Sequence, residues 1–167
     1  GTLTDHYDPS KDIMRLSDQV YNGTSIASVS IAAHESGHAI QDGTAYGFLR
    51  FRNAIAPAVN LVSAASWPLL IIGLIIIWQG NIATGNFIFN IGIIFFALVV
   101  LFHTVTLPVE FNASRRAIRQ LVELNIIDEA ESRGARKVLS AAAMTYVAAL
   151  ATAIANLVRI LMIRGRD

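Results

Sequence analysis

The hydrophobic positions of this chain form long unbroken runs rather than the short alternating stretches of a soluble domain. No charged residue lies between Arg52 and Glu110, and a second charge-free run extends from Val138 to Val158. A helix needs about 20 apolar residues to cross the hydrocarbon core of a bilayer. The first run therefore predicts two transmembrane helices and the second run predicts one, which we place at Leu61–Gln79, Asn86–Leu107 and Val138–Ile163.

The polar segment before the first span predicts a β-hairpin and a helix. Two β-capable stretches, Thr2–Tyr7 and Asp12–Ser17, flank a turn at Asp8–Lys11 whose second residue is proline. Proline at that position presets the backbone for a turn, and the aspartate before it can accept hydrogen bonds from the turn backbone. The alanine-rich stretch Ile26–Gln41 then predicts a helix, which the Asp42-Gly43 pair ends.

The segment behind the second span predicts a charged helix after Pro108, followed by a polar link over Asp128–Lys137. The whole pattern is typical of a mainly α-helical integral membrane protein. We expect three transmembrane helices, a short amino-terminal hairpin and a helix at the membrane surface. We expect a single domain over residues 1–167, composed of segments 1–59, 60–107, 108–137 and 138–163.

Composition agrees with a membrane location and excludes several functions. Hydrophobic residues make up 54% of the chain and charged residues only 15%, against about 25% charged residues in ordinary globular domains. The net charge of +1 and the absence of a basic patch with interleaved aromatics exclude a nucleic-acid partner. The chain has no cysteine, which excludes disulfides and thiolate metal sites. Because its first residue is Gly1, we expect a fragment or processed form that lacks an amino-terminal segment.

The distribution of lysine and arginine predicts the orientation in the membrane. The turn at 80–85 carries neither residue, whereas the segments before the first span and after the second span are rich in both. The positive-inside rule places these basic segments in the cytoplasm. Arg164 and Arg166 follow the third span and oppose this assignment, so the orientation of that span stays open.

Candidate chemistry is concentrated in the predicted surface helix, at His34-Glu35-Ser36-Gly37-His38. Residues four apart lie on one face of a helix, so His34 and His38 can present two imidazoles to one metal ion. Glu35 lies about 100° around the helix, where its carboxylate can reach a water molecule at the metal. Gly37 leaves room for another element to approach the helix closely. The alternative is that both histidines are ordinary helix residues, each with a hydrogen-bond partner.

A catalytic zinc site takes three protein ligands and leaves a position for water, so a third ligand has to come from elsewhere. Glu110 is the first carboxylate after the charge-free run. Two crossings of the membrane return the chain to the side on which it started, so Glu110 and the histidine pair lie on the same side. The alternative is that Glu110 only marks the point at which the helix enters water.

Several other polar residues are weaker candidates. His103 lies seven residues before Glu110, about 10 Å deeper along a helix, too far to share the same ion, and a packing role is favoured. Asn112 and Ser114 can orient a ligating histidine, although simple exposure explains them equally well. The exposed edge of the hairpin can accept an extended peptide or can act only as a cap. Four side chains are candidates for stabilising an oxyanion, none of them preferred: His6, Tyr7, Tyr146 and Arg115.

The motifs "LTDHYDP", "RLS", "AAHESGHAIQ", "LPVEFNASRRA" and "RKVLSAAAMTYVAAL" occur in this order over nearly the whole chain. Together they resemble the YugP-like bacterial membrane zinc metallopeptidases, an HExxH family of the gluzincin type. The resemblance implies that His34, His38 and Glu110 bind Zn²⁺ and that Glu35 is the general base. It also implies a further transmembrane helix before residue 1. Related membrane proteases often have aspartate where this chain has Ser114, so the groups that orient the ligands are expected to differ.

The favoured hypothesis is therefore a membrane-embedded zinc endopeptidase at the boundary between membrane and cytoplasm, which cleaves membrane or misfolded proteins. An intramembrane protease of the site-two type is less favoured, because the helix around His34 is short and charged residues follow it. The alternative from another class is a non-catalytic membrane scaffold or zinc carrier that uses the same ligands. Glu35 discriminates between these classes, since a carrier needs no base beside its ligands. The oligomeric state is not predicted.

Overall fold

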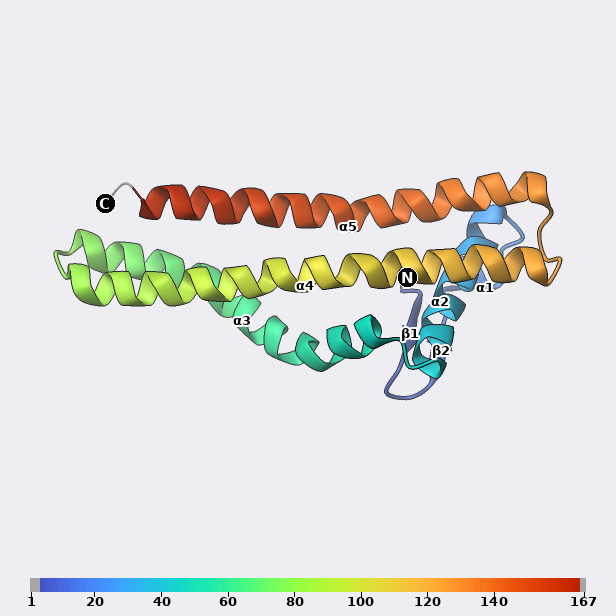
Figure 1. The fold of residues 1–167 in the computed structure, drawn as a ribbon, viewed down its shortest axis with the longest axis horizontal. Helices are drawn as coiled ribbons and strands as arrows, with labels where there is room; N and C mark the ends of the chain where they lie inside the picture. Colours follow the sequence, from blue (N-terminus) through green and yellow to red (C-terminus); the bar gives the residue numbers. More distant parts are fainter. Residues whose placement is uncertain (1–3, 166–167) are drawn as a thin grey trace. The chain divides into compact units, whose positions relative to one another are not determined.

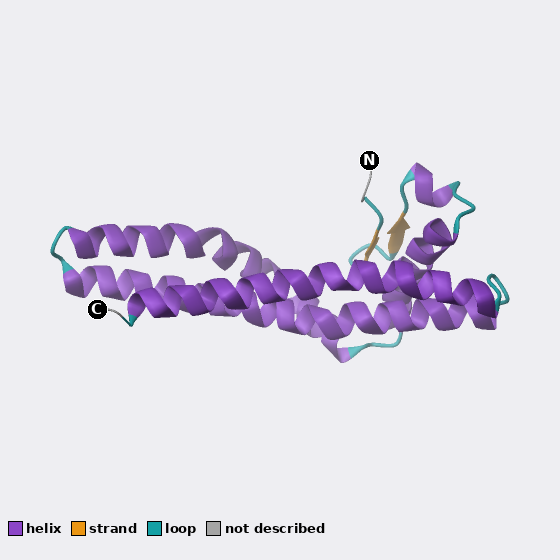
Figure 2. Ribbon diagram, turned by 90° about the horizontal axis from the view of Figure 1, so that it is seen from above, coloured by secondary structure: helices purple, strands orange, loops and turns teal. Residues whose placement is uncertain are grey.

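The computed structural model describes residues 4–165, which are almost entirely helical (Figures 1 and 2). The chain begins with a two-stranded antiparallel sheet in which His6 pairs with Arg15. Thr2 and Leu3, which we expected in the first strand, lie outside the described residues. The elements in chain order are β1 (His6–Asp8), β2 (Ile13–Arg15), α1 (Asp18–Tyr21), α2 (Ile26–Gly43), α3 (Gly47–Trp78), α4 (Ile82–Glu123) and α5 (Glu129–Arg164).

Helices α3, α4 and α5 are each long and apolar enough to cross a membrane. Many of their large apolar side chains are exposed, among them Ile71, Phe87 and Leu101. Such exposure is costly in water but suits contact with lipid chains, because the interior of a bilayer is as apolar as these side chains. The structure therefore confirms a mainly α-helical membrane protein with three spanning helices and a short amino-terminal hairpin.

The helices extend beyond the apolar runs that predicted them. α3 begins at Gly47, so residues 47–60, which precede the expected first span, are also helical. α4 continues through Pro108 as one helix. Proline removes one backbone hydrogen bond from a helix interior, a loss that membrane helices tolerate when their surroundings compensate. As a result, Glu110 lies on the same helix as the apolar run that precedes it.

α5 begins at Glu129, so the expected link over Asp128–Lys137 is helical from Glu129 onwards. A reciprocal capping box explains this start. The Glu131 N–H donates to Asp128 Oδ1 at 2.7 Å, and the Asp128 N–H donates to Glu131 Oε2 at 3.1 Å. Each carboxylate thereby satisfies a backbone donor at the helix start, where no intrahelical partner exists.

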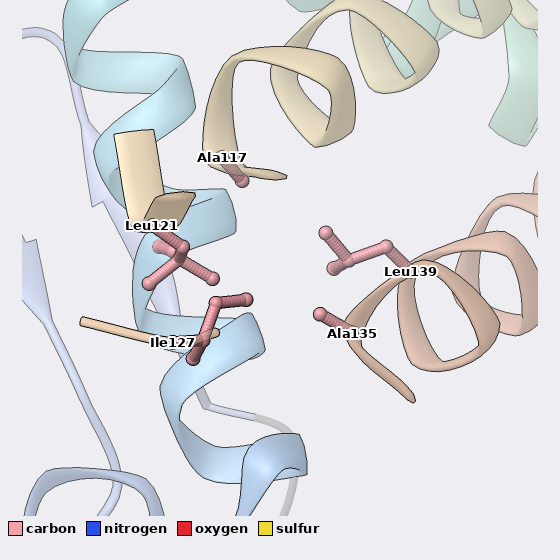
Figure 3. Packing of buried hydrophobic residues seen from close by; sticks show 6 residues of the cluster. Ala117, Leu121, Ile127, Ala135 and Leu139 are labelled. Atoms are coloured by element: carbon pink, nitrogen blue, oxygen red, sulfur yellow. The ribbon is translucent and has the colours of Figure 1, made fainter. Parts of the chain in front are cut away.

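The chain forms two compact units. The first unit contains Gly1–Arg50 and Thr106–Tyr146, and the second contains Phe51–Val105 and Val147–Asp167. In the first unit, α2 packs against the carboxyl-terminal part of α4 and the amino-terminal part of α5. The buried core between them includes Ala33 of α2, together with Ala117, Leu121, Ile127, Ala135 and Leu139 (Figure 3).

The second unit consists of the apolar parts of the three long helices. Its buried cluster contains Leu70, Phe89, Phe96 and Ile160. α3 and α4 approach closely at Gly73, where an added Cβ atom would lie 2.7 Å from the Phe89 backbone nitrogen. Small residues permit such close helix packing in membranes, where dispersion contacts replace the hydrophobic effect as the source of association.

Candidate metal centre

Helix α2 carries the two histidines and presents them to α4 within the first unit. The helix begins at a Ser25 cap, whose side chain accepts a hydrogen bond from the Ser28 N–H at 3.1 Å. One turn apart, the rings of His34 and His38 meet edge to face with centroids 4.8 Å apart. Gly37 allows the contact with α4, since an added Cβ atom would lie 2.5 Å from the Ala113 carbonyl oxygen. The close approach predicted for Gly37 is thus present.

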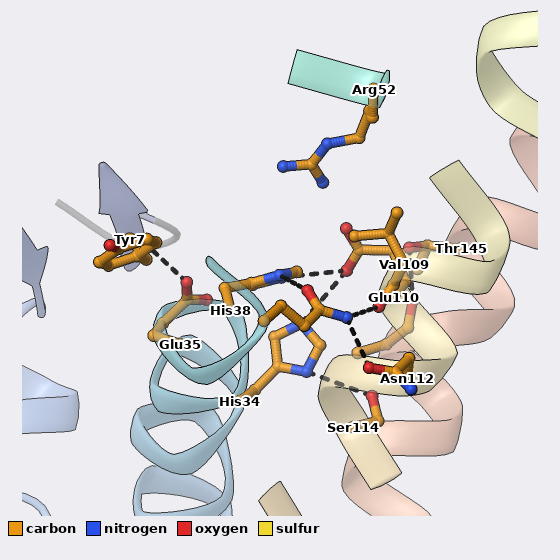
Figure 4. A network of polar contacts seen from close by, with 12 residues as sticks. Tyr7, His34, Glu35, His38, Arg52, Val109, Glu110, Asn112, Ser114 and Thr145 are labelled. Carbon is orange, nitrogen blue, oxygen red and sulfur yellow. Dashed lines mark hydrogen bonds and ion pairs between the residues drawn. The ribbon is translucent and has the colours of Figure 1, made fainter. Parts of the chain in front are cut away.

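The Glu110 carboxylate of α4 faces the two imidazoles of α2 (Figure 4). Its Oε2 atom lies 3.2 Å from His34 Nε2 and 3.6 Å from His38 Nε2. The three possible ligand atoms all lie within 4.8 Å of one another. The Glu110 side chain is almost completely buried, with 4% of its surface exposed. The structure therefore brings together all three ligands predicted from the sequence.

The other nitrogen of each ring is held by a hydrogen bond. His34 Nδ1 lies 3.2 Å from Ser114 Oγ, and His38 Nδ1 lies 3.0 Å from Gln41 Oε1. An amide oxygen only accepts hydrogen bonds, so Nδ1 of His38 carries the proton in this contact. The neutral form of that ring then has its lone pair on Nε2, the nitrogen that points towards Glu110. This is the tautomer that a metal ion requires.

The Gln41 amide is itself fixed in orientation. Its Nε2 atom donates to the Val109 carbonyl oxygen at 2.8 Å and to Asn112 Oδ1 at 3.0 Å, which leaves Oε1 to face His38. Asn112 Oδ1 also accepts a hydrogen bond from Arg116 Nε at 2.8 Å. Gln41 is fully buried. A chain of three polar side chains, Arg116, Asn112 and Gln41, therefore ends on Nδ1 of His38.

The charges at the centre favour a cation among these three groups. Burial opposes the charged forms of both His38 and Glu110, but their mutual contact outweighs it. The carboxylate of Glu110 raises the pKa of His38. A carboxylate facing two imidazole nitrogens requires positive charge between them, either protons or a metal ion. Two nitrogens and one carboxylate oxygen are a zinc ligand set that leaves a position for water, so these residues fit zinc.

Glu35 follows His34 on α2 and is not part of the group formed by His34, His38 and Glu110. Its carboxylate is largely buried, and Oε2 accepts a hydrogen bond from the Tyr7 backbone N–H at 2.9 Å. The hairpin is fastened to α2 by the Tyr7 hydroxyl, which lies 2.9 Å from Asp12 Oδ1 and 3.1 Å from Asp42 Oδ2. Burial and these two carboxylates raise the pKa of the Tyr7 hydroxyl, which therefore stays protonated at neutral pH.

The remaining candidates from the sequence are not members of this group. His6 is bonded to the Thr4 carbonyl oxygen, and Arg115 lines a separate groove described below. His103 belongs to the second unit. Sequence reasoning missed Gln41, although its position three residues after His38 places it one turn further along the same face.

Comparisons with known proteins identify the family of the chain. Residues 1–165 match the family described as "Putative neutral zinc metallopeptidase". The chain belongs to this family, as the sequence motifs predicted. It is also 47% identical over 169 residues to the "Putative membrane protease YugP" of Bacillus subtilis (strain 168), an alignment that covers 100% of this chain and 72% of that protein. No solved structure matches the chain.

Proposed function

We propose that the protein is a membrane-embedded zinc endopeptidase with His34, His38 and Glu110 as its ligands and Glu35 as its general base. The observation that carries this proposal is that three possible ligand atoms lie within 4.8 Å of one another. A separate buried carboxylate, that of Glu35, follows His34 on the same helix. Family membership and the likeness to a protein named as a membrane protease support the same activity.

When bound, zinc supplies Lewis acidity towards water and towards the carbonyl oxygen of a peptide. The protein side chains provide the other requirements. Gln41 keeps the His38 imidazole in the ligating tautomer, and the Ser114 hydroxyl orients the His34 imidazole. The Glu35 carboxylate accepts a proton from the attacking water and later returns it to the leaving amine. The Tyr7 N–H holds this carboxylate in place between the two transfers.

The base distinguishes a protease from a zinc carrier, so we expect Glu35→Gln to separate catalysis from metal binding. The rate of casein cleavage should fall about 10²- to 10⁴-fold, the usual contribution of a general base. Zinc content, measured on purified protein, should stay at the wild-type value because Glu35 is not a ligand.

Glu129→Gln provides the matched control, because it makes the same chemical change at an exposed position of the first unit. Its cleavage rate should equal that of the wild type. Wild-type activity in Glu35→Gln would rule out the mechanism. Loss of zinc from Glu35→Gln would instead place this carboxylate among the ligands.

We further propose that the metal centre faces the cytoplasm and that the substrates are membrane or misfolded proteins. The orientation rests on the positive-inside rule, applied to the basic residues of the first unit. Because the chain has no cysteine, a single Asn125→Cys substitution in the α4–α5 loop gives a clean test. A membrane-impermeant thiol reagent should label this cysteine only after cells are permeabilised. Labelling of intact cells would reverse the orientation.

A further inference from the structure

A second polar site lies in the first unit, in a groove between α4 and α5. Its volume is about 350 Å³, within the range of sites for small ligands. Three guanidinium groups line it, from Arg115 and Arg119 of α4 and from Arg136 of α5. None of the three forms an ion pair or a hydrogen bond with the residues that the structure describes. The rest of the lining consists of Ile118, Val122 and Glu123.

The groove opens on the side of α4 and α5 that faces away from α2. Ala117 of α4 packs in the core with Ala33 of α2, and Arg119 follows two residues later, about 200° around the helix. On α5, a Cβ atom added to Gly134 would lie 3.3 Å from the Ile26 side chain of α2, and Arg136 again follows by two residues. The groove and the metal centre therefore use different faces of α4.

The position of the arginines along their helices places them at the border of the bilayer. Arg136 lies two residues before the charge-free run of α5 begins at Val138. Arg115 lies six residues after the charge-free run of α4 ends at Val109. Side chains tilt towards the amino-terminal end of their helix, so Arg115 and Arg119 lean towards the apolar part of α4. We therefore expect the arginines near the ends of the apolar runs to lie close to the level of the lipid phosphates.

The chemistry of the lining identifies the class of ligand. Three arginines against one glutamate leave two net positive charges, and the planar guanidinium group matches the oxygens of a phosphate in pairs. Ile118 and Val122 are partly buried apolar side chains that also line the groove. A free phosphate ion gains nothing from such a surface, whereas the glycerol and upper acyl carbons of a lipid would cover it.

We propose that this groove binds the phosphate headgroup of an anionic phospholipid. Basic pockets beside membrane helices on the cytoplasmic side suit such headgroups, and each arginine near the surface strengthens binding by about fivefold. The site is independent of the metal centre, and a failure of the proposed protease activity would leave it intact.

Calorimetric titration of the whole protein in a neutral detergent tests the proposal with short-chain lipids. Dihexanoyl phosphatidylglycerol should bind at least about tenfold more tightly than dihexanoyl phosphatidylcholine, whose choline offsets the phosphate charge. The combined substitution Arg115→Gln, Arg119→Gln, Arg136→Gln should weaken phosphatidylglycerol binding about a hundredfold, at about fivefold per residue. Glu123→Gln should strengthen it several-fold, because it removes the only carboxylate in the lining.

The matched control removes three positive charges of the first unit that lie outside the groove, as Arg50→Gln, Arg133→Gln, Lys137→Gln. It should change the affinity less than about twofold if the groove is the site. Equal weakening in the two triple variants would overturn the proposal, because it would show that the lipid responds only to overall charge. Inorganic phosphate that binds as tightly as phosphatidylglycerol would overturn it as well, in favour of a soluble phosphate ligand.

Discussion

The two histidines of the metal centre lie one turn apart on α2, yet the protein holds them by different means. On one side, Nδ1 of His34 has a single contact, with the Ser114 hydroxyl at 3.2 Å. On the other side, Nδ1 of His38 contacts Gln41, whose amide is fixed by two further hydrogen bonds. A hydroxyl rotates and either donates or accepts, whereas the Gln41 oxygen only accepts. The protein therefore specifies the tautomer on the His38 side and leaves it adjustable on the His34 side.

The unequal support of the two imidazoles affects how tightly zinc would bind. A ligand held in one tautomer and one orientation loses little freedom when the metal binds, and outer hydrogen bonds of this kind usually change metal affinity by about 10- to 100-fold. The stronger arrangement on the His38 side should therefore contribute more to the affinity than the single hydroxyl on the His34 side. Three substitutions test this order. They remove the Glu110 carboxylate, the Gln41 amide and the Ser114 hydroxyl in turn.

The largest effect is expected from Glu110→Ala, which removes the carboxylate that contacts both histidines and that we propose as the third zinc ligand. Zinc content of the purified protein should fall from about one ion per chain to near zero, and cleavage should be lost with it. Elemental analysis after dialysis measures the content. An unchanged zinc stoichiometry would show that Glu110 is not a zinc ligand.

Gln41→Met should give the next largest effect, because it keeps the size of the side chain and removes the acceptor for Nδ1 of His38. Zinc affinity, measured by competition with a chromogenic chelator, should fall about 10- to 100-fold. Ser36→Ala is a matched control on the same helix, since its hydroxyl bonds, among the described residues, only to the Ala32 carbonyl oxygen of α2.

A purely structural role for Gln41 would produce a different result. In that case the thermal midpoint of the chelator-treated protein would fall while zinc affinity stayed within about twofold of the wild type. The positioning role predicts that zinc affinity changes in every sample that still folds.

The main features of the fold and of the candidate site could be predicted from the sequence. Two charge-free runs predicted the three spanning helices, and the spacing of His34, Glu35 and His38 predicted that both imidazoles share one helix face. The two membrane crossings between His38 and Glu110 predicted that Glu110 lies on the same side of the membrane as the histidine pair. Each of these signals depends on periodicity or on chain connectivity, which a single sequence contains.

The features that sequence analysis missed depend on pairing between distant side chains. Polar composition suggested a link over Asp128–Lys137, but Asp128 and Glu131 cap a helix there. The role of Gln41 depends on its contacts with Val109 and Asn112, about 70 residues away in the chain, and these follow only from the packing of α2 on α4. The role of the Tyr7 N–H depends in the same way on how the hairpin lies against α2.

The smallest effect on zinc affinity is expected from substitution of Ser114, which contacts His34. Two substitutions at this position should change the affinity in opposite directions. Ser114→Ala removes one neutral hydrogen bond, worth about 1 kcal/mol, and should weaken zinc binding about fivefold in the same competition assay. Ser114→Asp should strengthen binding, because a carboxylate accepts the Nδ1 proton in a charge-assisted bond about twice as strong as a neutral one. If Ser114→Ala instead costs as much as Gln41→Met, the two sides are equally supported, and the single hydroxyl orients its histidine as firmly as the buried amide does.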